Sequence, residues 1–339
     1  MARLRRSDCA APGISRTRRG RGFAYLDPAG EKIDDPEVLQ RISELTIPPA
    51  WREVWICMDS LGHLQATGLD AAGRKQYLYH ERWRAHRDRL KFDSMLAFGR
   101  ALPRMRRRVS RDLAGEELSS ERVLACAVRL LDLGFFRVGS EDYAEQNESY
   151  GLSTIQKRHV SLLRDEVVFD YPAKSGQRRI QAIADADVLG VLTALKRRRS
   201  GGENLLAHRD DGRWREVRAE DVNAYIKSAG AGEFSAKDFR TWNATVLAAI
   251  ALAAHADARR SRTARNRAIG DAIKTVSAYL GNTPAVCRAS YVDPRVIDSF
   301  QAGTTIGPSI ERLPHGPDMA DERTRTRIEK AVLALLGSD

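Results

Sequence analysis

The sequence predicts an α+β fold, in which a small β-rich N-terminal domain precedes a larger, mainly α-helical domain with a three-stranded antiparallel insert. Three observations support this prediction. Residues 22–85 are rich in aromatic and β-branched residues separated by Gly and Pro, which is typical of short strands and turns. In residues 86–339 the apolar residues recur mainly at helical spacing, but between residues 159 and 184 the spacing falls to two.

The N-terminal region is expected to begin with a tail. Residues 1–21 are rich in Arg, Ser, Gly and Ala, which predicts a basic, mobile segment. Within residues 22–85 we expect one short helix, from Pro36 to Leu45. We also expect a hairpin there, whose second strand covers residues 75–80.

An apolar stripe predicts a helix that ends just before Arg137. The helix is expected to start at Ser119-Ser120 and to close at Gly134, so that Arg137 lies beside a fixed core element. In the antiparallel insert, the turn Ser175-Gly176-Gln177 places Lys174 at the tip of a hairpin. A lysine at such a tip can swing into a groove.

Two further helices are expected before Tyr291. Ser235 is the predicted N-cap of the first, which reaches about His255 and carries Lys237 and Arg240 in its opening turns. The second runs from about residue 265 to Gly281.

Tyr291 itself is predicted to lie on a short helix that starts at Thr283-Pro284 and that Pro294 ends. The apolar face of this helix is expected to comprise Ala285, Ala289 and Val292. Tyr291 is displaced by roughly 100° from Val292 and should therefore point away from the core.

The charge balance favours a polyanionic partner. The chain has 56 Lys and Arg against 45 Asp and Glu, which gives a formal net charge of +11. Basic residues cluster in five runs, namely 3–6, 16–21, 104–111, 196–199 and 259–267. One such run is usually a solvated face, but five in one chain favour a surface that follows nucleic-acid phosphates.

Other classes of protein are disfavoured by what the sequence lacks. It contains no apolar stretch near the ~18 residues of a membrane-spanning helix, and no apolar segment follows the N-terminal arginines as in a secretory signal. The four cysteines are isolated, so neither a zinc site nor a disulfide framework is indicated. We therefore expect a cytoplasmic protein with no membrane partner and no bound metal.

The most informative residue is Tyr291, because a series of cationic and polar residues precedes it. These are Arg137, Lys174, Lys237, Arg240 and Asn282. Tyrosine is a poor nucleophile at its usual pKa of ~10, so an enzyme that uses it on a phosphodiester must bind the pentacoordinate phosphate strongly. Each residue alone has an ordinary structural explanation, such as packing or helix capping, but their joint occurrence favours one site.

The sequence motifs around these residues resemble those of the type IB DNA topoisomerases, in the compact form found in poxviruses and many bacteria. The resemblance runs from about residue 22 to about residue 313. Four motifs support the resemblance, namely Gly134-Phe135-Phe136-Arg137-Val138-Gly139, Ser149-Tyr150-Gly151-Leu152-Ser153-Thr154, Lys237-Asp238-Phe239-Arg240 and Gly73-Arg74-Lys75-Gln76-Tyr77-Leu78-Tyr79.

The resemblance implies a nicking and religating enzyme that relaxes positive and negative supercoils without ATP or metal. Tyr291 would form a 3′-phosphotyrosyl intermediate, and Arg137 and Arg240 would clamp the non-bridging oxygens. Lys174 would protonate the leaving 5′ oxygen, with assistance from Lys237. Many relatives have histidine where this chain has Asn282, which implies hydrogen bonding there without titration.

The resemblance also implies how DNA is held. Gln76, Tyr77 and Tyr79 would read the major groove, and Tyr143 would contact a phosphate. The expected architecture is a clamp formed by the two domains around duplex DNA, and the expected active form is a monomer associated with the nucleoid.

Two other functions fit parts of the sequence. A tyrosine recombinase shares the Arg, Lys, Arg and Tyr chemistry, but it normally has a helical N-terminal domain and assembles four protomers. A non-catalytic DNA-binding protein of the same fold needs only the basic runs and the helices. The reaction product discriminates among the three.

Overall fold

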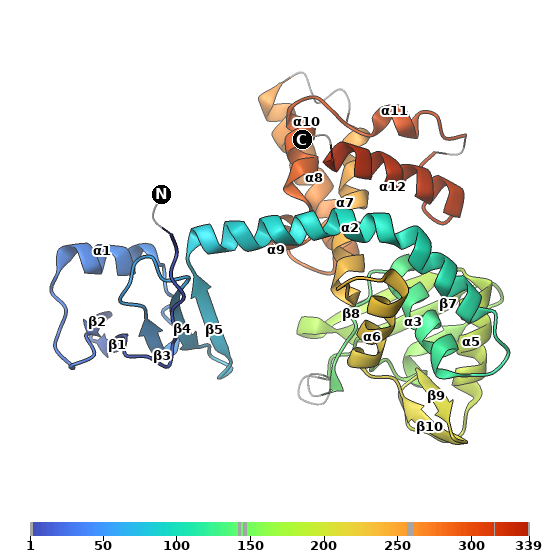
Figure 1. The fold of residues 1–339 in the computed structure, drawn as a ribbon, viewed down its shortest axis with the longest axis horizontal. Coiled ribbons are helices and arrows are strands. Elements are labelled where there is room, and N and C mark those ends of the chain that lie inside the picture. Colours follow the sequence, from blue (N-terminus) through green and yellow to red (C-terminus); the bar gives the residue numbers. More distant parts are fainter. Residues whose placement is uncertain (1–2, 142–143, 145–147, 256–260, 315, 338–339) are drawn as a thin grey trace. The chain divides into compact units, whose positions relative to one another are not determined.

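The computed structural model describes residues 3–141, 144, 148–255, 261–314 and 316–337. The chain divides into two compact units, with the boundary between Phe92 and Asp93. This boundary lies within the long helix α2 (Glu81–Leu113), which continues from one unit into the next (Figure 1). None of the helices in the described ranges is long and apolar enough to cross a membrane.

The first unit is built on a five-stranded antiparallel sheet in the order β2-β1-β3-β4-β5. The strands are β1 (Ile14–Arg19), β2 (Gly22–Leu26), β3 (Arg52–Ile56), β4 (Leu64–Leu69) and β5 (Lys75–Tyr79). Helix α1 (Pro36–Glu44) starts where the Asp35 carboxylate accepts hydrogen bonds from the backbone N–H groups of Glu37 and Val38. Its Ile42 joins Ile14, Val54, Ile56 and Ala66 in the core of this unit.

The expectation of a mobile tail over residues 1–21 is wrong for most of that segment. Ile14 is buried, and β1 pairs with both β2 and β3. The guanidinium of Arg16 donates hydrogen bonds to the carbonyls of Ile47, Pro48 and Trp51. Strand pairing and these hydrogen bonds order the segment, although its composition predicted disorder.

The second unit combines helices with a three-stranded antiparallel sheet, as predicted. The sheet has the order β6-β7-β8, with β6 (Val160–Leu162), β7 (Val167–Ala173) and β8 (Gln177–Ile183), and a hairpin of β9 (Ala207–Asp210) and β10 (Arg213–Glu216) lies apart from it. The further helices are α3 (Ser120–Leu133), α5 (Ala186–Arg197), α6 (Ala219–Gly230), α7 (Ala236–Ala253), α8 (Arg262–Leu280), α9 (Pro284–Ser290), α10 (Pro294–Gln301), α11 (Gly307–Ile310) and α12 (Glu322–Leu336).

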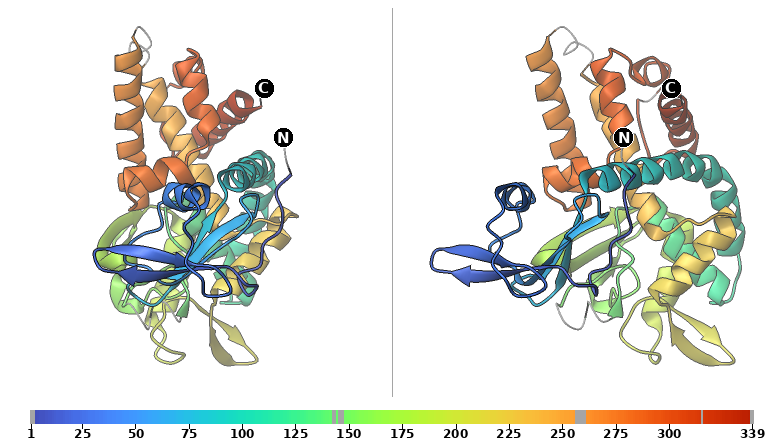
Figure 2. Two further views of the ribbon diagram at one scale, coloured as in Figure 1. Left: turned by 90° about the vertical axis from the view of Figure 1, so that its left-hand side faces the viewer. Right: turned by 60° about the vertical axis from the view of Figure 1, so that its left-hand side comes forward.

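These elements form two groups within the second unit (Figures 1 and 2). One group contains the sheet with α3, α5 and α6, and the other contains α8, α10, α11 and α12. Helix α7 contacts members of both groups. Residues next to the predicted catalytic arginines anchor this arrangement, because Phe136 packs edge-on against Phe169 of β7 and Phe239 packs edge-on against Phe98 of α2.

Candidate active site

The candidate site is organised around the C-terminus of helix α8. Gly281 ends the helix with a positive φ of 62°, a conformation that glycine adopts without strain. Four consecutive carbonyls here, from Ala278 to Gly281, each accept a hydrogen bond from an arginine side chain. The final carbonyls of a helix lack intrahelical partners and form the negative end of its dipole, so this end attracts cations.

Three arginines from different elements supply these bonds. Arg179 of β8 donates to Ala278 O at 3.3 Å and to Tyr279 O at 2.6 Å. Arg240 of α7 donates to Leu280 O at 3.0 Å, and Arg137 donates to Gly281 O at 3.2 Å. The structure therefore brings Arg137 and Arg240 together, 103 residues apart in sequence, as the resemblance implied.

Arg137 is held in place by the loop that follows α3. Ser119 caps α3 and Gly134 closes it, as the sequence predicted. The backbone of Arg137 then accepts a hydrogen bond from Leu152 N at 2.7 Å, and its guanidinium donates to Asn282 Oδ1 at 2.7 Å. Asn282 thus joins Arg137 directly, while its amide nitrogen Nδ2 is buried and has no hydrogen-bond partner among the described residues.

Arg240 is almost fully buried, with 4% of its surface exposed. Its guanidinium also donates to the carbonyl of Phe135, and its Nε is buried without a hydrogen-bond partner among the described residues. Burial, and then repulsion from Arg137, lower the pKa of Arg240 to about 10. Two neighbouring guanidinium groups in a partly buried site disfavour each other's charge, so an anion bound between them would relieve both.

Tyr291 lies beside Arg240, whose Cζ is 5.4 Å from the centre of the phenol ring. The buried hydroxyl of Thr245 on α7 fixes the backbone here, because it lies 3.3 Å from Tyr291 O and accepts from Asp293 N at 3.1 Å. Tyr291 is half-buried. The nucleophile predicted from sequence therefore lies against one of the predicted phosphate-binding arginines.

The predicted helix around Tyr291 is shorter than expected. Helix α9 ends at Ser290 with Tyr291 as its C-cap, and Pro294 begins α10 instead of ending α9. The buried residue of α9 is Cys287, whereas Ala285 and Ala289 are exposed, so the predicted apolar face is wrong for these two alanines, while Val292 is buried as predicted. The reason is that Asp293 caps α10 and turns the chain immediately after Tyr291.

Lys174 and Lys237 lie at different positions relative to the arginines. Lys174 is exposed on the short turn that joins β7 to β8, and it lines a cavity of about 180 Å³ together with Arg137, Gly139 and Tyr150. Lys237 lies one turn before Arg240 on α7 and is also exposed. The structure brings Lys174 to the same cavity as Arg137, but it shows no hydrogen bond from the Lys237 ammonium to another described residue.

The predicted DNA-reading residues belong to the first unit. Tyr77 and Tyr79 stack on one face of β5 with their rings 6.2 Å apart, and 47% of Tyr77 is exposed. The Gln76 amide donates to Asp70 Oδ2 at 2.9 Å. Tyr143 lies outside the described residues.

Sequence reasoning missed Arg179 and Thr245. Arg179 follows Arg178 in a strand with several polar residues, and only alternation along the strand distinguishes their two faces. Thr245 carried no signal beyond its place on α7. The backbone groups that Arg179 binds, and those that Thr245 contacts at Tyr291 and Asp293, lie in distant segments, so no pattern of side chains pointed to these contacts.

Two family models match this chain. The one described as eukaryotic DNA topoisomerase I, catalytic core, matches residues 80–303. The one described as bacterial DNA topoisomerase IB, N-terminal domain, matches residues 22–70. Together they match parts of both units.

Individual relatives agree with these matches. The chain is 31% identical over 297 residues to DNA topoisomerase 1B of Acanthamoeba polyphaga mimivirus, a match that covers 85% of this chain and 88% of the relative. It is 24% identical over 153 residues to DNA topoisomerase 1B of Vaccinia virus (strain Western Reserve), which covers 44% of this chain and 48% of that relative. The DNA topoisomerase I of Monkeypox virus matches over the same shares.

Proposed function

This chain belongs to the type IB DNA topoisomerases, and from that premise we propose that Tyr291 is the nucleophile with which it cuts and rejoins one strand of duplex DNA. The observation that carries this assignment is the position of the Tyr291 ring beside Arg240, at the helix end where Arg137 and Asn282 also meet. The phenolic oxygen attacks the phosphorus, forms the 3′-phosphotyrosyl bond and displaces the 5′ oxygen. Strand rotation before religation releases supercoils of either sign.

Arg137, Arg240 and Asn282 bind the reacting phosphate in this proposal. The two guanidinium groups supply permanent charge to the non-bridging oxygens, which carry more negative charge in the transition state than in the ground state. The Nδ2 of Asn282, which has no hydrogen-bond partner within the described part of the chain, supplies a hydrogen bond to the phosphate. Because an amide does not titrate, Asn282 contributes no ionisation to the pH–rate profile.

Lys174 is the proposed general acid. It lines the same cavity as Arg137, so a phosphate bound by Arg137 presents its leaving 5′ oxygen within range of a flexible lysine side chain. Lys174 donates a proton to that oxygen as the bond breaks, and the phenolic proton of Tyr291 passes to solvent. Lys237, one turn from Arg240, assists the proton transfer.

The nucleophile is tested by plasmid relaxation. The parent enzyme should relax positively and negatively supercoiled plasmid in EDTA without ATP. Tyr291→Phe should bind DNA normally, form no covalent adduct and relax none. Tyr279→Phe, which alters an exposed tyrosine of α8, is the matched control and should relax plasmid at the parental rate. Undiminished relaxation by the Tyr291 variant would exclude this mechanism.

The general acid is tested with a DNA substrate whose leaving 5′ oxygen is replaced by sulfur, which leaves without a proton. Lys174→Ala should slow cleavage of the oxygen substrate by roughly 10²–10⁴-fold, the usual contribution of a general acid. It should slow the sulfur substrate far less. Equal slowing of both substrates would remove Lys174 from this role.

We propose that the active form is a monomer in the bacterial cytoplasm, where it binds the nucleoid with both of its units on duplex DNA. The net charge of +11 and the exposed Tyr77 on β5 support the DNA-binding part of this proposal. Recombined segments at paired sites would favour the recombinase alternative, and binding without any relaxation would favour the non-catalytic one.

A further inference from the structure

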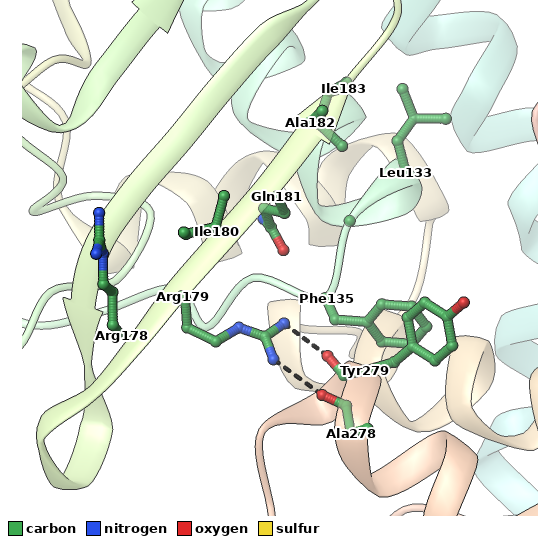
Figure 3. Close-up of a pocket in the computed structure, with 11 residues that line it drawn as sticks. Leu133, Phe135, Arg178, Arg179, Ile180, Gln181, Ala182, Ile183, Ala278 and Tyr279 are labelled. Atoms are coloured by element: carbon green, nitrogen blue, oxygen red, sulfur yellow. Dashed lines mark hydrogen bonds between the residues drawn. The ribbon is translucent and has the colours of Figure 1, made fainter.

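Arg179 connects two elements of the site, strand β8 and the C-terminus of helix α8. It belongs to β8, the strand that leaves the turn carrying Lys174, and its guanidinium spans two carbonyls at the end of α8 (Figure 3). Those carbonyls precede Gly281 and Asn282, the residues that Arg137 contacts. Arg179 therefore joins the hairpin of Lys174 to the loop that leads to Tyr291.

Side-chain packing does not fill the space between β8 and the end of α8. A cavity of about 550 Å³ lies there, lined by Leu133, Phe135, Ile180, Gln181 and Tyr279 as well as Arg179 (Figure 3). Two of the lining residues, Ala278 and Tyr279, accept the hydrogen bonds from Arg179 (Figure 3). Through these bonds to Ala278 O and Tyr279 O, Arg179 connects β8 to the end of α8.

The helix end is shaped to receive this side chain. A Cβ at Gly281 would lie 3.0 Å from Arg179 Nη1, so the guanidinium comes very close to the glycine. A planar guanidinium presents two N–H groups in a fixed fork and so bridges neighbouring carbonyls, which the single ammonium of a lysine cannot do in the same way. The bonds from Arg179 are directed to the protein backbone.

We propose that Arg179 is a positioning residue that holds the Lys174 hairpin in register with the C-terminus of α8, so that Lys174 reaches the leaving 5′ oxygen. This role rests on the proposed function of Lys174. Arg179 acts through the general acid and makes no contact with the reacting phosphate. Its loss should therefore impair the step that needs a proton and leave the other steps largely intact.

The oxygen and sulfur substrates distinguish this role from phosphate binding. Arg179→Met removes the guanidinium and keeps the length of the side chain. It should slow cleavage of the oxygen substrate by roughly 10- to 100-fold, the scale expected when a catalytic group is misplaced by about 1 Å. Cleavage of the sulfur substrate should change by less than about threefold. Equal slowing of both substrates, or no slowing of either, would overturn the proposal.

The neighbouring Arg178 provides a matched control. It is exposed on the same strand and pairs with Asp170 across the hairpin at 2.5 Å. Arg178→Met should leave cleavage of both substrates at parental rates. If Arg178→Met shows the same substrate pattern as Arg179→Met, the effect comes from the strand as a whole and the specific role of Arg179 is wrong.

Two more variants complete the test. Arg179→Lys, which also serves if the methionine variant fails to fold, should show an intermediate loss confined to the oxygen substrate. The double variant Lys174→Ala/Arg179→Met should cleave the oxygen substrate no more slowly than Lys174→Ala, because both changes affect the same proton transfer. Additive losses would overturn the proposal. If Lys174→Ala itself slows both substrates equally, the proposed role of Lys174 fails, and that result is distinguishable from failure of Arg179 alone.

Discussion

Two glycines fix the backbone on which Arg137 stands. A Cβ at Gly151 would lie 2.4 Å from Gly139 Cα and 2.9 Å from Arg137 O, so the two segments approach more closely than any side chain allows. Gly139 also has a φ of 89°, which favours glycine. These contacts explain why two of the sequence motifs contain glycine. Gly139 and Gly151 both allow the close backbone approach that positions Arg137.

We predict that Gly151→Ala slows cleavage and also lowers the stability of the fold. The methyl group meets backbone atoms that cannot rotate away, so the Arg137 segment must shift, and a displacement near 1 Å costs about 100-fold in rate. The free energy of unfolding should fall by about 1–3 kcal/mol, as for other overpacked sites. Single-turnover cleavage and urea unfolding measure the two effects.

Gly190→Ala is the control for this substitution. Gly190 lies within α5, and a Cβ there would meet nothing within 4 Å. Alanine is favoured over glycine by roughly 0.5–1 kcal/mol inside a helix, so this variant should be slightly more stable and fully active. A Gly151 variant with parental cleavage would show that the close glycine contact does not position Arg137.

At the scale of elements, the C-terminus of α8 explains how three cations coexist before DNA binds. Arg137, Arg179 and Arg240 repel one another, but each donates to a carbonyl at the negative end of the helix dipole. The guanidinium groups are thus oriented by the protein, and those of Arg137 and Arg240 keep their charge for the proposed phosphate. Such preorganisation avoids reorganisation during the reaction.

Local patterns predicted individual elements well. The caps and apolar stripe of α3 depend on residues close in sequence, and the helix lies where they indicated. The same holds for the three strands of the insert, whose alternation and turns are local. The extent of α9 was wrong because Asp293 and Pro294 also carry the signature of a helix start, and that signal prevailed.

The sequence predicted only those site residues whose order along the chain resembles that of a known family. Arg137 and Arg240 were identified from their sequence motifs. Arg179 was missed, because it donates to carbonyls that lie 99 and 100 residues away in the sequence. Every residue has a carbonyl, so sequence does not single out these partners. Only the fold identifies which carbonyls lie at the end of a helix, where they lack intrahelical hydrogen-bond donors.

At the scale of the second unit, a buried ionic network ties the C-terminal helix to the catalytic core. Arg106 of α2 pairs with Asp132 of α3 at 2.8 Å and with Glu329 of α12 at 2.6 Å. Arg325 of α12 adds a contact with Asp132 at 3.4 Å, and Trp242 of α7 donates to Glu329 at 3.3 Å. The two arginines and two carboxylates balance in charge, and their side chains are at most 8% exposed.

We predict that Glu329→Gln destabilises the protein by about 3–5 kcal/mol, the usual result of leaving a buried charge uncompensated. The matched control is the double variant Arg106→Met/Glu329→Met. It removes one charge of each sign and leaves Arg325 paired with Asp132, so it should cost much less. Urea unfolding at neutral pH measures both, and equal losses would show that charge balance is unimportant here.

The same network predicts how stability depends on pH. Burial disfavours the Asp132 carboxylate, but the charges of Arg106 and Arg325 outweigh it and hold the pKa of Asp132 below its ordinary value. A carboxyl group whose folded-state pKa is lowered stabilises the fold above its unfolded pKa of about 3.9, and this stabilisation is lost as pH falls towards the folded value. In Asp132→Asn the acid-induced loss below pH ~4 should therefore be smaller than in the parent, although the variant is less stable at neutral pH. Because Asp132 lies five residues before Arg137, acid that loosens the network should also release the segment that carries this proposed phosphate-binding arginine.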